Sequence, residues 1–262
     1  MRKIIKDLFF RLLGKSIKIK GIYSSWQIAK KHAGTYDSDL IINKVKESAL
    51  KVKRGEASYE RDSVLFYDKS YPFPLLAGLL RVAALNGGKL RVLDFGGSLG
   101  SVYFQCRDFL SGLKEVKWCN VEQEKFVVIG RNLFEDEELK FYFSIEECLQ
   151  VESPDVIIFS SVLQYLEKPY EVLDKAIKHF NHIIIDRNPF SEIPDDLIAV
   201  QVVPDYIYKA SFPFWIFSRK KFLDYLFKRG YRLIAEFPAV DGTLKYKNIK
   251  ISFKGYIFDR LS

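Results

Sequence analysis

The sequence predicts an α/β protein: a seven-stranded, mostly parallel sheet flanked by helices and preceded by a helical N-terminal extension. From Leu90 onward, short apolar runs alternate with stretches of helical period. Strand–helix alternation at this spacing is typical of right-handed βαβ units, which build a parallel sheet. With 262 residues, 48% of them hydrophobic, the chain is long enough to bury a large core.

Each predicted element has a local reason. Five apolar runs predict the first strands, at residues 90–95, 116–121, 139–143, 155–160 and 181–186. Helices are expected between them, at residues 100–112, 123–134, 144–149 and 169–179. Ser218 can cap a helix over residues 219–229, which Gly230 ends. Residues 231–237 and 251–258 complete the sheet as its last two strands.

Two segments lie outside this alternation. Residues 1–73 are expected to form the helical extension or cap, with a helix at 39–53, and residues 74–262 the main domain. After the fifth strand, residues 187–217 contain four prolines and seven aromatic residues. A connection of this length in a compact domain is usually functional, so we expect a lid-like insertion there.

The net charge of +8 is concentrated at the N-terminus. Residues 1–20 carry seven basic residues against Asp7, or +6, which leaves +2 for the rest of the chain. A nearly balanced body does not favour nucleic-acid binding. The apolar residues of 1–13 recur at helical spacing, so this helix either lies on an anionic membrane surface or packs on the body or a second subunit. The oligomeric state stays open.

Cysteine usage indicates the compartment. Cys106, Cys119 and Cys148 are scattered, with no C-x-x-C pair. This pattern does not favour a disulfide framework or a structural zinc site, and no other metal-ligand cluster is apparent. We therefore expect a cytoplasmic protein, which residues 1–20 could hold at the periphery of the inner membrane.

A glycine-rich turn follows the first predicted strand. The run Asp94-Phe95-Gly96-Gly97-Ser98-Leu99-Gly100 leads from that strand into a helix. Glycine lets the backbone approach a ligand closely, and the helix start presents free N–H groups. Glu122 ends the second predicted strand, 22 residues after Gly100, where an acid can bind ribose hydroxyls. The turn and the acid predict a nucleoside-cofactor site that includes Gln123.

Two cofactors could use this turn, and an ordinary strand–turn with Asp94 as a helix cap is the third interpretation. A nicotinamide dinucleotide needs G-x-G-x-x-G, but the pattern read from Gly96 meets Ser98 and then Ser101. The S-adenosylmethionine pattern, D-x-G-x-G-x-G, places an acid where it can face the cations of the cofactor. Asp94, Gly96 and Gly100 fit it, while Ser98 stands where the middle glycine is usual. The acid favours S-adenosylmethionine.

On these residues the chain resembles class I S-adenosylmethionine-dependent methyltransferases. More narrowly, it resembles a family of methyltransferases encoded with bacterial capsule and lipopolysaccharide genes. The similarity covers residues 22–258 and is carried by the segments 26–36, 93–97, 185–190, 213–215 and 230–231. It implies a Rossmann-like methyltransferase domain over residues 74–262 with S-adenosylmethionine as cofactor. Ser98 departs from the expected glycine, which bears on the affinity for the ligand.

Residues 155–166 resemble the fourth-strand region of class I methyltransferases. Because ligands of open α/β sheets bind outside the carboxyl ends of the strands, Ser160, Ser161, Gln164 and Tyr165 are expected to border the methyl donor. Tyr165 could equally be a packing residue. By position alone, Ser144 is expected at the edge of the adenine.

Four residues are candidates for the chemistry of transfer. Asp186 ends the fifth strand and is the best-placed general base, with Arg187 as a partner for an anionic substrate group. A buried structural ion pair explains these two residues equally well. His32 could reach the site only if the extension folds over it, and Tyr165 lies near the donor. The aromatic residues of 206–217 either form a substrate wall or cover the sheet.

The predicted function is O-methylation of an intermediate in bacterial surface polysaccharide biosynthesis. The acceptor would be a small molecule, an anionic sugar or a nucleotide-activated glycan intermediate, and no nucleic acid is expected. Two alternatives stay open: a NAD(P)-dependent oxidoreductase or epimerase of nucleotide sugars, and a non-catalytic methyltransferase-like subunit.

Overall fold

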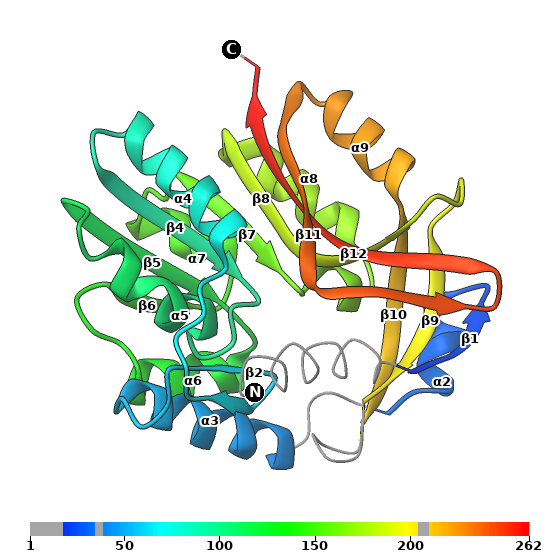
Figure 1. The fold of residues 1–262 in the computed structure, drawn as a ribbon, viewed down its shortest axis with the longest axis horizontal. Helices are drawn as coiled ribbons and strands as arrows, with labels where there is room; N and C mark the ends of the chain where they lie inside the picture. Colours follow the sequence, from blue (N-terminus) through cyan, green and yellow to red (C-terminus); the bar gives the residue numbers. More distant parts are fainter. Residues whose placement is uncertain (1–17, 35–38, 204–209, 262) are drawn as a thin grey trace. The chain divides into compact units, whose positions relative to one another are not determined.

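The computed structural model describes residues 18–34, 39–203 and 210–261, which fold into two compact units (Figure 1). Unit 1 comprises Met1–Asp37, Ser161–Leu173 and Ile185–Ser262, and unit 2 comprises Ser38–Ser160 and Asp174–Ile184. The strand β8 (His182–Ser191) begins in unit 2 and continues into unit 1.

The sheet of unit 2 has the strand order β8-β7-β4-β5-β6. Its strands are β4 (Lys89–Phe95), β5 (Glu115–Val121), β6 (Leu139–Tyr142) and β7 (Val156–Ser160), with the start of β8. The pairs β4–β5, β4–β7 and β5–β6 are all parallel. Residues 156–159 of β7 are all fully buried, as expected for a parallel strand whose two faces are both covered.

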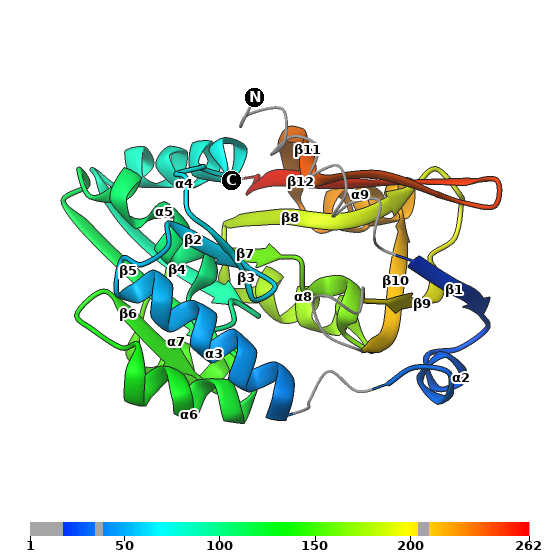
Figure 2. The same ribbon diagram turned by 60° about the horizontal axis from the view of Figure 1, so that its bottom comes forward.

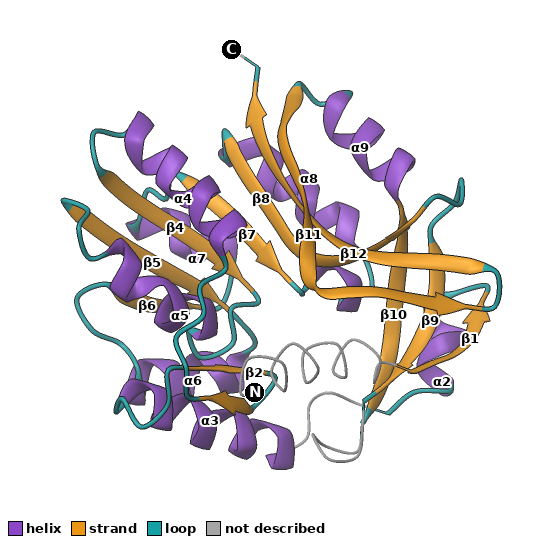
Figure 3. Ribbon diagram, viewed as in Figure 1, coloured by secondary structure: helices purple, strands orange, loops and turns teal. Residues whose placement is uncertain are grey.

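Helices pack on both sides of this sheet (Figures 2 and 3). They are α4 (Phe73–Leu85), α5 (Ser101–Leu110), α6 (Glu124–Leu133), α7 (Ile145–Val151) and the end of α8 (Pro169–His179). A further helix, α3 (Asp39–Lys53), packs against α5. Between α3 and α4 the chain forms a short hairpin, β2 (Tyr59–Arg61) and β3 (Val64–Phe66). Unit 2 thus has the predicted βαβ organisation.

Unit 1 is dominated by antiparallel pairs. Its strands are β1 (Lys18–Tyr23), β9 (Leu197–Val202), β10 (Ser211–Ser218), β11 (Tyr231–Tyr246) and β12 (Ile249–Arg260), with the end of β8. β9 lies between β1 and β10, and β11 pairs with β12 as a long hairpin. β10 runs parallel to the end of β8, which also pairs with β12. The helices are α2 (Trp26–Lys31) and α9 (Arg219–Phe227), with the 3₁₀ turn η1 (Leu163–Tyr165).

The predicted fold class is confirmed: a mixed α/β fold with a mostly parallel central sheet flanked by helices. The count of seven strands was too low, because β1, β9 and β10 were not predicted. The last two predicted strands also extend further, to Tyr246 and Arg260.

The extension and the insertion differ from their predictions. Residues 1–73 are not wholly helical, because they include β1 and the β2–β3 hairpin. The segment 187–217 forms strand over most of its described length, as the end of β8, β9 and β10. Most side chains of β10 are buried, including Phe212, Phe214 and Ile216, as expected for a strand covered on both faces. Prolines are uncommon within strands, so the sequence did not indicate this one.

The basic amphipathic segment at 1–13 lies outside the described residues. Among the described helices, none is both long enough and apolar enough to cross a membrane.

Candidate cofactor site

The turn between β4 and α5 contains three left-handed residues. Gly96, Ser98 and Gly100 have φ of 75°, 55° and 89°. The N–H of Gly96 donates to the carbonyl of Val121 at 2.8 Å, which joins the turn to β5. Positive φ explains glycine at 96 and 100 and makes Ser98 the strained position, since a side chain disfavours this region by roughly 1–2 kcal/mol.

Two side chains of β5 hold Ser98 in place. Its N–H donates to Glu122 Oε1 at 3.2 Å, and its carbonyl accepts from Asn120 Nδ2 at 2.7 Å. Residues i and i+2 of a strand point to the same side, so Asn120 and Glu122 reach the turn together. Asn120 was missed by the sequence analysis, although its spacing from Glu122 was a usable signal.

Relief of this strain is testable. Ser98→Gly is expected to raise the free energy of unfolding by about 1 kcal/mol, because glycine adopts positive φ without a steric penalty. Urea unfolding measures the change. Ser111→Gly is the matched control, because Ser111 has a right-handed helical backbone (φ −60°) and glycine there should destabilise. A Ser98→Gly protein less stable than the wild type would contradict the strain.

Asp94 lies beneath the turn. Its side chain is fully buried, and Oδ2 accepts from Trp118 Nε1 at 3.1 Å. Oδ1 is also buried and has no hydrogen-bond partner among the described residues. Burial raises the pKa of Asp94 to about 7, the negative charge of Glu122 adds to the rise, and the Trp118 hydrogen bond opposes it. The carboxyl group therefore carries a proton readily until a positive charge approaches.

Gly97 closes over Asp94 and allows no side chain. A Cβ at this position would lie 2.6 Å from Asp94 Oδ2 and 2.0 Å from Asn120 Oδ1. Glycine is required here by the close approach of the backbone to two buried polar groups. The backbone of the turn thus packs directly against side chains of β4 and β5.

Glu122 is half-buried at the end of β5. Besides the bond from Ser98, its Oε2 accepts from the N–H of Gln123 at 2.7 Å. Burial raises the pKa of Glu122, while these two backbone hydrogen bonds oppose the rise. A carboxylate offers about four acceptor positions, so Glu122 can still accept hydrogen bonds from ligand hydroxyls. Gln123 is exposed at the start of α6.

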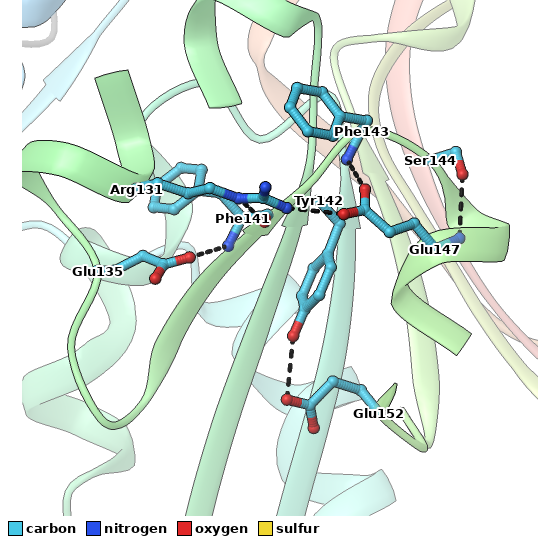
Figure 4. Close-up of polar contacts among 8 residues, drawn as sticks. All are labelled: Arg131, Glu135, Phe141, Tyr142, Phe143, Ser144, Glu147 and Glu152. Carbon is cyan, nitrogen blue, oxygen red and sulfur yellow. Dashed lines mark hydrogen bonds and ion pairs between the residues drawn. The ribbon is translucent and has the colours of Figure 1, made fainter. Parts of the chain in front are cut away.

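Figure 4 shows the end of β6, where Ser144 caps α7. Ser144 Oγ accepts from the N–H of Glu147 at 3.0 Å, and Glu147 Oε2 accepts from the N–H of Phe143 at 2.6 Å. Arg131 pairs with Glu147 at 2.8 Å and lies over the Phe143 ring, 4.7 Å from its centroid. The Ser144 hydroxyl thus has a structural role. The sequence did not single out Phe143, whose side chain is 46% exposed just after β6.

Four further predicted residues meet in unit 1. Ser161 has φ of 57°, and its N–H donates to the carbonyl of Asp186 at 2.9 Å. Gln164 Nε2 donates to Ser161 Oγ at 3.0 Å and to the carbonyl of Arg187 at 3.4 Å. Ser160, also predicted, is the half-buried last residue of β7 in unit 2.

Arg187 forms a bidentate ion pair within unit 1. Its Nε and Nη2 bind Asp241 Oδ2 and Oδ1 at 2.9 and 3.0 Å, and the two side chains are only 14% and 15% exposed. Asp241 thus offsets the charge of the guanidinium, and the partnership of Arg187 with an anionic substrate group stays a prediction. Asp186 itself is 8% exposed.

Tyr165 and His32 both pack against aromatic rings within unit 1. The Tyr165 hydroxyl donates to Gln201 Oε1 at 3.2 Å, and its ring meets Phe212 edge-on at 4.9 Å. His32 is exposed at the end of α2 and stacks on Tyr23 at 5.1 Å. The two residues do not come together in the described contacts.

The aromatic residues of 206–217 mainly cover the sheet. Phe212, Phe214 and Phe217 are buried, and Trp215 stacks on Trp26 at 5.8 Å. Tyr206 and Tyr208 lie outside the described residues.

No protein-family profile and no curated protein sequence matches the chain. Solved structures do. The N-terminal domain of EvdMO1, solved in the presence of SAH and D-fucose, is 12% identical, with a TM-score of 0.51 over 87% of this chain and 100% of that domain. An S-adenosylmethionine-dependent methyltransferase from Clostridium acetobutylicum is 12% identical, with a TM-score of 0.46 over 84% of this chain and 99% of that one. CalS10, an amino pentose methyltransferase from Micromonospora echinaspora, is 10% identical, with a TM-score of 0.45 over 81% and 96%.

At these identities the likeness concerns the fold. The chain has the Rossmann-like fold of class I methyltransferases, with the glycine-rich turn at the end of the central strand β4.

Proposed function

We propose that this chain is an S-adenosylmethionine-dependent methyltransferase that binds the methyl donor at the turn between β4 and α5. The observation that carries the proposal is the pair of carboxyl groups at this turn. Asp94 lies beneath it with one unpartnered buried oxygen, and Glu122 lies beside it. Such a site favours a cationic cofactor, because a pyrophosphate would meet two acidic groups.

The residues of the turn fit this donor. Glu122 would accept hydrogen bonds from the ribose hydroxyls, and Gln123 and Ser144 would border the nucleoside at the ends of β5 and β6. Asp94 would act on the positive charge from below, through the thin backbone of Gly96 and Gly97. Gly100 and Ser160 complete the proposed donor-binding set within unit 2, and the roles of Ser161 and Gln164 in donor binding stay predictions from the sequence.

When bound, S-adenosylmethionine supplies an activated methyl carbon with a neutral thioether as leaving group. The protein has to hold the acceptor oxygen in line with that carbon, roughly 3 Å away and shielded from water. A neutral hydroxyl acceptor also has to lose its proton, and Asp186 is the proposed base. The electron pair of the breaking C–S bond remains on sulfur, so no metal or redox partner is needed.

The proposed acceptor is a hydroxyl group of a saccharide. The resemblance to methyltransferases encoded with bacterial capsule and lipopolysaccharide genes supports a surface polysaccharide intermediate. The presence of D-fucose with SAH in the EvdMO1 structure agrees with a sugar acceptor. Asp241 already neutralises the charge of Arg187, so Arg187 does not require a negative charge on the acceptor.

The donor site is tested by removing the ribose contact. Glu122→Ala is expected to weaken the binding of S-adenosylhomocysteine (SAH), the demethylated form of the donor, by roughly 10- to 100-fold. Hydrogen bonds to a charged group are each worth about 1.5–3 kcal/mol. Titration calorimetry measures the loss. Glu124→Ala, which removes an exposed acid at the start of α6, is the control and should bind normally. Normal SAH binding by Glu122→Ala would contradict the assignment.

A further inference from the structure

Glu60 is a buried acid that the proposed donor site does not use. It lies on β2 and is 4% exposed. No ion pair joins it to a cation in the described part of the chain, although buried carboxylates are usually paired. Burial raises the pKa of Glu60; the hydrogen bonds it accepts from Ser101 and Ser63 oppose the rise.

Both carboxylate oxygens of Glu60 have a fixed direction. Oε2 accepts from the N–H of Ser63 at 3.0 Å, and Oε1 accepts a hydrogen bond from the hydroxyl of Ser101. The β2–β3 hairpin thus places the carboxylate of Glu60 in contact with the Ser101 side chain of α5.

Ser101 lies where the glycine-rich turn becomes helix. It is the first residue of α5, follows Gly100, and is half-buried rather than sealed in the core. A serine hydroxyl has one proton and two acceptor lone pairs. Because the proton is given to Glu60, Oγ can only accept from any further partner. The negative charge behind it makes Oγ a stronger acceptor, as expected for linked hydrogen bonds.

In the proposed site, the α-ammonium group of the donor still needs a binding partner near Ser101. In the proposed site Glu122 and Ser144 would border the nucleoside at the ends of β5 and β6, and the amino-acid moiety would then lie toward the turn and the start of α5. Its α-ammonium needs hydrogen-bond acceptors. Asp94 does not offer an exposed one, because its carboxyl group is sealed beneath Gly97.

We propose that Ser101 binds the α-ammonium of the methyl donor and that Glu60 is a positioning residue, which directs and strengthens the Ser101 hydroxyl as an acceptor. The proposal rests on the proposed function and names the group that one further part of that site recognises. It also explains why a carboxylate that forms no ion pair among the described residues, with only the neighbouring Arg61 to lower its pKa, is kept buried at the edge of the turn.

Two ligands distinguish recognition of the α-ammonium by Ser101 and Glu60 from a purely structural role of these residues. SAH carries the α-ammonium, whereas 5′-methylthioadenosine has the same nucleoside and sulfur but lacks the amino-acid moiety. Glu60→Gln and Ser101→Ala are each expected to weaken SAH binding about tenfold, the size of one charge-assisted hydrogen bond, and to leave 5′-methylthioadenosine binding within about twofold. The double variant should lose no more than Ser101→Ala alone, because Glu60 acts through Ser101.

Glu56→Gln is the matched control, because it removes an acid whose side chain is 51% exposed. Thermal unfolding of every variant shows that the fold is retained, and Ser101→Ala carries the test should Glu60→Gln fail to fold. Equal losses for both ligands mean a purely structural role and overturn the proposal, as do unchanged affinities for SAH. A wild-type protein that binds neither ligand refutes the proposed function itself, a result distinct from failure of this inference alone.

Discussion

Gly97→Ala is expected to abolish binding of the methyl donor. The new Cβ would lie 2.0 Å from Asn120 Oδ1 and 2.6 Å from Asp94 Oδ2, far inside van der Waals contact. Both neighbours are short, fully buried side chains on adjacent strands and cannot swing aside. The turn must therefore lift from the sheet, which breaks the two bonds that hold Ser98.

Calorimetry should show a loss of SAH affinity of at least about 100-fold, with a fall in stability of roughly 1–3 kcal/mol from overpacking. Gly112→Ala is the control, since nothing lies within 4 Å of a Cβ there. If Gly97→Ala binds SAH as well as the control does, the close packing of the turn on Asp94 is not a requirement of the site.

The protonation state of Asp94 is expected to change both the free energy of unfolding and the affinity for the methyl donor. Its folded-state pKa of about 7 lies above the ordinary value of 3.8, so the folded protein holds a proton that the unfolded chain releases. Stability contributed by this group is therefore lost as pH rises from about 4 to about 7. A shift of this size corresponds to an upper limit of about 4 kcal/mol above pH 7.

Asp94→Asn, which cannot ionise, should accordingly be more stable than the wild type at pH 8, by an amount that shrinks toward pH 4. The same variant should bind S-adenosylmethionine more weakly at pH 8, since the positive donor is expected to favour the ionised carboxylate. Urea unfolding and calorimetry over pH 5–8.5 measure both effects. Asp195→Asn, at an exposed position, controls for the change in net charge. An Asp94→Asn protein with wild-type stability at pH 8 and unchanged affinity would show that the carboxylate has no electrostatic role.

The sequence predicted the parts of the fold with local causes. The runs at β4 and β7 are apolar because parallel strands are covered on both faces, and this pattern is visible in the sequence. Gly96 and Gly100 stand at positions of positive φ, and Glu122 follows a strand at the expected spacing. These features needed no knowledge of distant residues.

The contacts that could not be predicted join residues far apart in the chain. Trp118 bonds Asp94 across 24 positions, and Ser101 reaches Glu60 across 41. Arg187 finds Asp241 54 residues later, which is why the sequence left its role open between an anion receptor and a structural ion pair. Strand pairing has the same origin: β1 becomes a strand because β9, about 180 residues away, offers it an edge.

The turn above Asp94 and beside Glu122 is proposed to bind a positively charged nucleoside. This binding is tested most directly by calorimetric titration of the wild-type protein at pH 8 with S-adenosylmethionine, SAH and NAD in parallel. We expect one site with micromolar affinity for S-adenosylmethionine and SAH, and no measurable heat with NAD. Binding of NAD in preference to SAH, or no binding of any of the three, would contradict it.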